Sequence, residues 1–119
     1  MHGRFVAIVD DDTAVRNSLK FLMETSGYEV MAYTSAIDFL ADRTEQPACL
    51  IVDYNMPGMT GLEMVAWLRR DGSAIPVLLM TGFAPSALLE RAEQLGIETV
   101  LEKPLEIEPL LKFVSAHRS

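Results

Sequence analysis

A short apolar run stops at one acid and a group of turn residues in the sequence Cys49-Leu50-Ile51-Val52-Asp53-Tyr54-Asn55-Met56-Pro57-Gly58. Its length and its lack of charge predict a buried strand. Asp53 would then lie at the C-terminal end of that strand, the edge where open α/β sheets gather their reactive groups. We therefore expect Asp53 to be the chemical centre of this protein.

Three further apolar runs end in the same way, with polar residues directly after the last apolar side chain. Residues 5–9 precede Asp10, Asp11 and Asp12, residues 76–80 precede Thr81, and residues 99–101 precede Glu102 and Lys103. Because the carboxyl ends of parallel strands lie side by side, these residues should form a cluster of carboxylates beside one hydroxyl and one ammonium. A hard cation and a phosphoryl group would fit there.

Four groups of residues stand in the order and approximate spacing of a known family: Asp10-Asp11, Asp53 with Met56-Pro57-Gly58, Thr81-Gly82 and Lys103-Pro104. With them the chain resembles the receiver domain of two-component response regulators. The sequence is also similar to that of the FixJ-like branch at Ser35-Ala36, Phe39-Leu40 and Glu102-Lys103-Pro104. The resemblance covers essentially the whole chain, so we expect a single receiver domain over residues 1–119.

The pattern of apolar residues predicts five strands alternating with five helices. Besides the four runs above, residues 28–32 form a strand pattern, and helical patterns cover residues 15–23, 35–41, 62–68, 88–95 and 107–114. Asp12 or Thr13 can cap the first helix, Thr60 begins a capping box, and Pro85 suits the first turn of the fourth helix. We expect an α/β, flavodoxin-like (βα)5 doubly wound parallel sheet with strand order 2-1-3-4-5, which places strands one and three side by side.

Length and composition exclude several classes of protein. A chain of 119 residues with 50% hydrophobic residues is a single folded domain, and its net charge of −7 without a Lys/Arg cluster argues against direct binding of nucleic acid. No apolar stretch approaches the ~20 residues of a membrane helix, and the N-terminus lacks the features of a signal peptide, so we expect no membrane association and a cytoplasmic protein. Cys49, the single cysteine, is expected to be a small core residue.

The resemblance implies a Mg²⁺ site, since crowded carboxylates repel one another unless protons or a cation intervene. By resemblance, Asp11 binds the metal directly and Asp10 acts mainly through a water. Asp53 would contribute one carboxylate oxygen, and Asn55 its backbone carbonyl. Asp12 would be only a helix cap.

The resemblance also assigns roles in phosphoryl transfer. Asp53 is the expected phosphoacceptor, taking a phosphoryl group from a sensor histidine kinase or a phosphotransfer protein. Lys103 would contact Asp53 and later a phosphoryl oxygen, and Pro104 would follow a cis peptide bond that aims the lysine inward. Thr81 would donate its hydroxyl to the new phosphoryl group and so act as the switch. On this reading the chain is not a conventional enzyme, although it assists its own phosphorylation and dephosphorylation.

Two positions modify this scheme. Three residues before Lys103 the family usually carries Tyr or Phe, whereas this chain has Val100, so the coupling between the threonine and an aromatic ring cannot operate in its usual form. Phe83, two residues after Thr81, is expected to shield the acyl phosphate from water. The alternative is that Phe83 points away into the gap beside Val100. Phosphorylation is expected to act through the face of the fourth helix, fifth strand and fifth helix, with a homodimer as one outcome.

Two competing functions remain open at this point. A haloacid-dehalogenase-like Mg²⁺ phosphatase also uses a strand-end aspartate, a Ser/Thr and a lysine, but it needs a second aspartate where this chain has Asn55. A degenerate receiver could serve as an unphosphorylated docking module, but Asp53, Thr81 and Lys103 are all present. The sequence does not indicate the cognate kinase, the physiological output or whether an effector domain follows Ser119.

Overall fold

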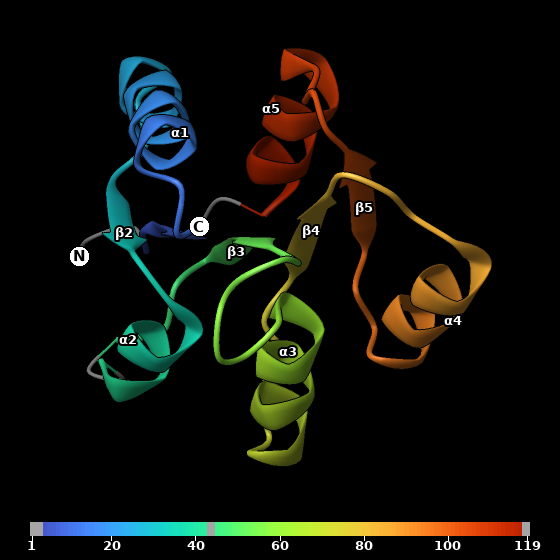
Figure 1. The fold of residues 1–119 in the computed structure, drawn as a ribbon. Coiled ribbons are helices and arrows are strands. Elements are labelled where there is room, and N and C mark those ends of the chain that lie inside the picture. Colours follow the sequence, from blue (N-terminus) through green and yellow to red (C-terminus); the bar gives the residue numbers. More distant parts are fainter. Residues whose placement is uncertain (1–3, 43–44, 118–119) are drawn as a thin grey trace.

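The computed structural model describes residues 4–42 and 45–117 and has a central five-stranded parallel sheet in the order β2-β1-β3-β4-β5 (Figure 1). The strands are β1 (Val6–Val9), β2 (Val30–Tyr33), β3 (Cys49–Asp53), β4 (Val77–Thr81) and β5 (Thr99–Glu102). The helices are α1 (Thr13–Thr25), α2 (Ala36–Ala41), α3 (Gly61–Arg70), α4 (Ser86–Gln94) and α5 (Ile107–Ala116). The predicted fold class and strand order are confirmed.

Helices cover both faces of the sheet, with α1 and α5 on one side and α2, α3 and α4 on the other (Figure 1). Every residue of β1, β3 and β4 is buried, as expected for parallel strands packed on both faces. Successive residues of each strand therefore feed two separate cores. Ala7, Leu50 and Leu79 belong to the core under α2, α3 and α4, whereas Ile8 and Ile51 belong to the core under α1 and α5.

Polar caps fix where two of the helices begin. The carboxylate of Asp12 accepts hydrogen bonds from the amides of Ala14 and Val15, so Asp12, and not Thr13, caps α1. At the start of α3, Thr60 and Glu63 exchange the two hydrogen bonds of the predicted capping box. Pro85 is the N-cap of α4 and not part of its first turn, and it offers no side-chain hydrogen bond.

The second strand begins later than the sequence predicts. We expected a strand over residues 28–32, but β2 covers Val30–Tyr33. The amide of Tyr28 donates to the carbonyl of Met23, and Gly27 has a positive φ of 96°. These residues therefore complete the C-terminal end of α1, because the left-handed conformation that closes a helix favours glycine.

Gly61 lets α3 begin directly against the end of β3. A Cβ atom at this position would lie 2.5 Å from the backbone oxygen of Asp53. The amide of Gly61 also donates to the carbonyl of Tyr54 at 2.9 Å. Only glycine allows this close approach, which fixes the backbone that carries Asp53.

Within the described residues, each helix is too short or too polar to span a bilayer.

Candidate functional site

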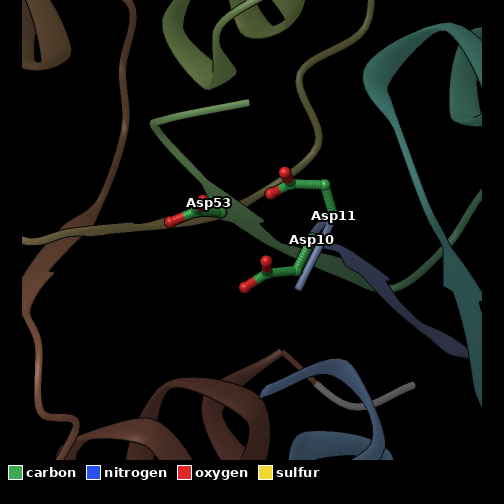
Figure 2. A group of neighbouring side chains, drawn as sticks. All are labelled: Asp10, Asp11 and Asp53. Atoms are coloured by element: carbon green, nitrogen blue, oxygen red, sulfur yellow. The ribbon is translucent and has the colours of Figure 1, made fainter. Parts of the chain in front are cut away.

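Three aspartates meet at the carboxyl edge of the sheet (Figure 2). Asp10 and Asp11 follow β1, and Asp53 ends β3, the neighbouring strand. One carboxylate oxygen from each lies within 4.8 Å of the others. Asp10 and Asp53 are buried, with 0% and 4% of their surface exposed, whereas Asp11 is exposed. The adjacency of strands one and three thus produces the predicted acidic cluster.

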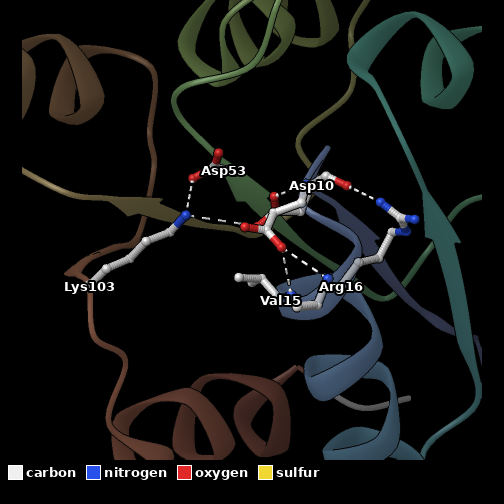
Figure 3. Close-up of polar contacts among 7 residues, drawn as sticks. Asp10, Val15, Arg16, Asp53 and Lys103 are labelled. Carbon is white, nitrogen blue, oxygen red and sulfur yellow. Dashed lines mark hydrogen bonds and ion pairs between the residues drawn. The ribbon is translucent and has the colours of Figure 1, made fainter.

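Lys103 reaches this cluster from the end of β5 (Figure 3). Its Nζ atom lies 2.8 Å from Asp53 Oδ1 and 4.0 Å from Asp10 Oδ2. The amide of Lys103 donates to the carbonyl of Thr81 at 2.8 Å, which aligns the ends of β5 and β4. The Lys103–Pro104 peptide bond is cis, as expected.

The two carboxylate oxygens of Asp10 differ in their hydrogen bonding. Its Oδ1 accepts a hydrogen bond of 2.9 Å from the amide of Asp12, and its backbone carbonyl accepts one of 2.7 Å from Arg16 Nη1 (Figure 3). Its Oδ2 is buried and, among the described residues, has no hydrogen-bond partner, with Lys103 Nζ at 4.0 Å as its ion-pair contact. Since a buried carboxylate oxygen is costly to leave unpaired, this atom is well placed to bind a cation. Sequence reasoning gave Arg16 no role in the site, although Val15-Arg16 is among the residues that resemble the FixJ-like branch and Arg16 lies in the first turn of α1.

Burial and neighbouring charges set the protonation of the cluster. Burial raises the pKa of Asp10, and the amide of Asp12 opposes this only in part. Burial likewise raises the pKa of Asp53, against the hydrogen bond and charge of Lys103. Burial opposes the charged form of Lys103, but its hydrogen bond to Asp53 and the surrounding carboxylates outweigh this and raise its pKa. Additional positive charge would reduce the repulsion among the three carboxylates. A hard divalent cation fits such a site.

The hydroxyl of Thr81 is engaged with the loop that follows β4. Thr81 is buried, and its Oγ1 donates to the carbonyl of Phe83 at 2.8 Å and accepts from the amide of Phe83 at 3.3 Å. The ring of Phe83 is 71% exposed. Asn55, Thr81 and Phe83 line one open groove, together with Tyr54, Gly82 and residues of α4. The structure thus places these three residues around one hollow between the loops after β3 and β4.

Val100 lies in a different part of the molecule from this groove. It is half-buried in β5 and packs against the core under α2, α3 and α4. It also lines a second open groove, with Leu89 and Glu93 of α4 and with Ile97. Position 100 therefore carries a β-branched side chain and no aromatic ring.

Comparison with known proteins identifies this arrangement. Residues 6–115 match the family model of the response regulator receiver domain. The chain belongs to this family. Among curated relatives it is 40% identical to the transcriptional regulatory protein FixJ of Azorhizobium caulinodans and 34% identical to FixJ of Bradyrhizobium diazoefficiens. Each alignment covers 93% of this chain, but only 53% and 55% of the relative. The chain therefore spans about half the length of these relatives.

Solved structures agree with this assignment. The crystal structure of FixJ-N superposes with a TM-score of 0.86 at 31% identity, covering 97% of this chain and 93% of that one. The chemotaxis protein CheY4 of Vibrio cholerae gives a TM-score of 0.87 at 28% identity, covering 96% and 98%. Full-length FixJ from B. japonicum gives 0.85 at 33% identity, but this chain covers only 57% of it.

The chain is therefore a receiver domain of the kind found in two-component response regulators. The match to the family over residues 6–115 does not favour the phosphatase alternative, and the complete set of Asp53, Thr81 and Lys103 does not favour the unphosphorylated docking module. The family assignment agrees with the predicted FixJ-like branch.

Proposed function

We propose that Asp53 accepts a phosphoryl group from a sensor histidine kinase or a phosphotransfer protein. The observation that carries this proposal is the ion pair of Asp53 with Lys103 at 2.8 Å, beside an Asp10 oxygen that accepts no hydrogen bond from the described residues. A buried carboxylate with one fixed oxygen is positioned to attack with the other. The family to which the chain belongs supports the same role.

Asp53 acts as the nucleophile in this scheme. One of its carboxylate oxygens forms a bond to phosphorus while the bond between phosphorus and the donor nitrogen breaks, and the leaving imidazole keeps the electron pair. The product is an acyl phosphate on Asp53. Lys103, which holds Oδ1 before transfer, remains beside the phosphoryl oxygens as a fixed positive charge. The domain thereby assists its own phosphorylation by positioning and electrostatics.

Mg²⁺ is the cofactor that the donor atoms fit best. Asp11 would bind it directly, Asp10 mainly through a water, Asp53 through one oxygen and Asn55 through its backbone carbonyl. Support comes from the three carboxylates with ligand atoms within 4.8 Å of one another and from Asp10 Oδ2, which accepts no hydrogen bond from the described residues. When bound, the metal supplies positive charge for the transferring phosphoryl oxygens.

Loss of the phosphoryl group depends on a water in line behind phosphorus. Asn55 and Phe83 flank the groove through which such a water would approach. We assign Phe83 the role of an apolar shield, since its ring can neither donate nor accept a hydrogen bond to orient water. Thr81 would release the loop and donate to the phosphoryl group. Because Val100 has no aromatic ring, the family's usual coupling between this threonine and an aromatic side chain would not operate.

The partners follow from the same scheme. Residues 1–119 would act as one receiver module that signals by protein contacts, through the face of α4, β5 and α5 and with a homodimer as one outcome. The match to about half of each FixJ relative is consistent with an output domain elsewhere in the protein. Incubation with acetyl phosphate and Mg²⁺ tests the proposal, because intact mass measurement should find one added phosphoryl group, absent when Mg²⁺ is chelated.

A further inference from the structure

Two side chains hold the loop of residues 82–84 between β4 and α4. Thr81 and Glu102 are paired across the ends of β4 and β5. Thr81 Oγ1 donates to the carbonyl of Phe83 at 2.8 Å, and Glu102 Oε2 accepts from the amide of Ala84 at 3.1 Å. We call these two contacts the β4–α4 latch.

The position of Glu102 suits this contact electrostatically. Helix α4 begins after Pro85, which has neither an amide hydrogen nor a capping side chain. The carboxylate of Glu102 therefore supplies the acceptor just ahead of this helix, where negative charge is favoured by the partial positive charge of the helix N-terminus. It stabilises the loop in the conformation described here.

That conformation competes with the proposed switching step. The hydroxyl of Thr81 carries one hydrogen, so it cannot donate to the carbonyl of Phe83 and to a phosphoryl oxygen at once. Donation to the phosphoryl group would leave the Phe83 carbonyl without this partner, and the loop would have to rearrange. The Glu102 contact, one residue further along, favours the arrangement that exists before this change.

We propose that Glu102 is a positioning residue that acts through the Ala84 amide and sets the free energy of switching. This inference rests on the proposed function of Asp53. It adds a residue that restrains the switching step that follows phosphorylation. A ligand that binds only the rearranged state has an apparent affinity that is reduced by the small population of that state. Weakening the latch raises this population, so it tightens binding even though it removes a stabilising hydrogen bond.

The test uses beryllofluoride with Mg²⁺ as the probe, since beryllofluoride mimics a phosphoryl group on a carboxylate. Binding to the full chain is followed by amide NMR spectra, which also report hydrogen exchange at Ala84. Glu102→Ala should bind about three- to tenfold more tightly than the parent, as expected for loss of one solvent-exposed hydrogen bond of ordinary strength. Its Ala84 amide should exchange faster in the free protein.

Two further variants separate the latch from general damage. Glu102→Gln keeps the length and an acceptor oxygen but loses the charge, so its affinity should lie between those of the parent and Glu102→Ala. Glu106→Ala is the charge-matched control, because Glu106 precedes α5 without a side-chain capping bond, and it should bind like the parent.

The opposite results would overturn the inference. If Glu102→Ala and Glu102→Gln bind beryllofluoride no more tightly than Glu106→Ala, Glu102 only stabilises the fold. If the parent itself binds no beryllofluoride and is not labelled by acetyl phosphate, the proposed function of Asp53 fails together with the latch. If the parent is labelled normally but the two Glu102 variants show no gain in beryllofluoride affinity, only the latch proposal is wrong.

Discussion

Lys103 Nζ lies 2.8 Å from Asp53 Oδ1, so the ends of β5 and β3 are joined across β4 by an ion pair. Asp53 is almost fully buried, whereas the Lys103 side chain is 33% exposed. A partly exposed ammonium can follow a change of charge on its partner, from carboxylate to acyl phosphate. The pair therefore links the proposed nucleophile to the group that would stabilise its product.

Replacement of Lys103 tests this link. Lys103→Ala removes the positive charge beside Asp53 and should slow labelling by acetyl phosphate about tenfold or more, as expected for loss of a fixed charge near developing negative charge. The measurement is the initial rate of mass increase at fixed Mg²⁺. Lys20→Ala serves as the control, because Lys20 pairs with Glu24 on the surface of α1. Equal labelling rates for the two variants would show that Lys103 does not contribute to phosphoryl transfer.

The raised pKa of Asp10 predicts how stability depends on pH without metal. A carboxyl group whose folded pKa lies above its ordinary value of 3.8 contributes stability below that value and loses it as pH rises through the folded pKa. At neutral pH in EDTA, Asp10→Asn should therefore raise the free energy of unfolding, because the neutral amide replaces a carboxylate whose charged form is disfavoured by burial. Urea unfolding measures this difference.

The same variant carries its own control. The gain should shrink as pH falls and should be smallest below 3.8, where the parent carboxyl binds a proton in both states. With Mg²⁺ present the parent should recover stability that the variant cannot. If the variant is less stable than the parent in EDTA at neutral pH, the charge of Asp10 does not destabilise the folded state.

The metal site predicts different effects for two adjacent aspartates. Mg²⁺ should raise the melting temperature of the parent, because a ligand at tenfold its Kd stabilises the folded state by about 1.4 kcal/mol. Asp11→Asn should abolish most of this shift. Asp12→Asn should retain it and should change stability without metal only slightly, because Asn caps a helix about as well as Asp does. Equal loss of the Mg²⁺ response in both variants would contradict the assigned ligands.

The lifetime of the acyl phosphate tests the role of Phe83. Phe83→Glu places a carboxylate where the apolar ring stands, so it could orient the attacking water and should shorten the lifetime about tenfold. The decay of the phosphorylated mass at fixed Mg²⁺ measures it. Leu89→Glu adds the same charge at another exposed apolar residue and should leave the lifetime unchanged. If Phe83→Glu decays no faster than this control, the ring does not shield the site.

The sequence predicts the cluster well because each of its members lies within two residues of the end of a short apolar run. Asp10, Asp53 and Lys103 had to meet once the strands were parallel and in this order. The contacts of Arg16 and Glu102 could not be predicted, since they depend on side-chain rotamers and on the path of a loop. The start of β2 was misplaced because β-propensity at Tyr28 does not reveal that its amide closes α1.

The most direct test of the account is the position of the phosphoryl group. After incubation with acetyl phosphate and Mg²⁺, borohydride reduction converts a phosphorylated aspartate to homoserine, which peptide mass mapping can locate. We predict homoserine at position 53 alone, with labelling abolished in Asp53→Asn and retained in Asp12→Asn. Homoserine at another aspartate of the parent, or undiminished labelling of Asp53→Asn, would contradict the assignment of Asp53 as the phosphoacceptor.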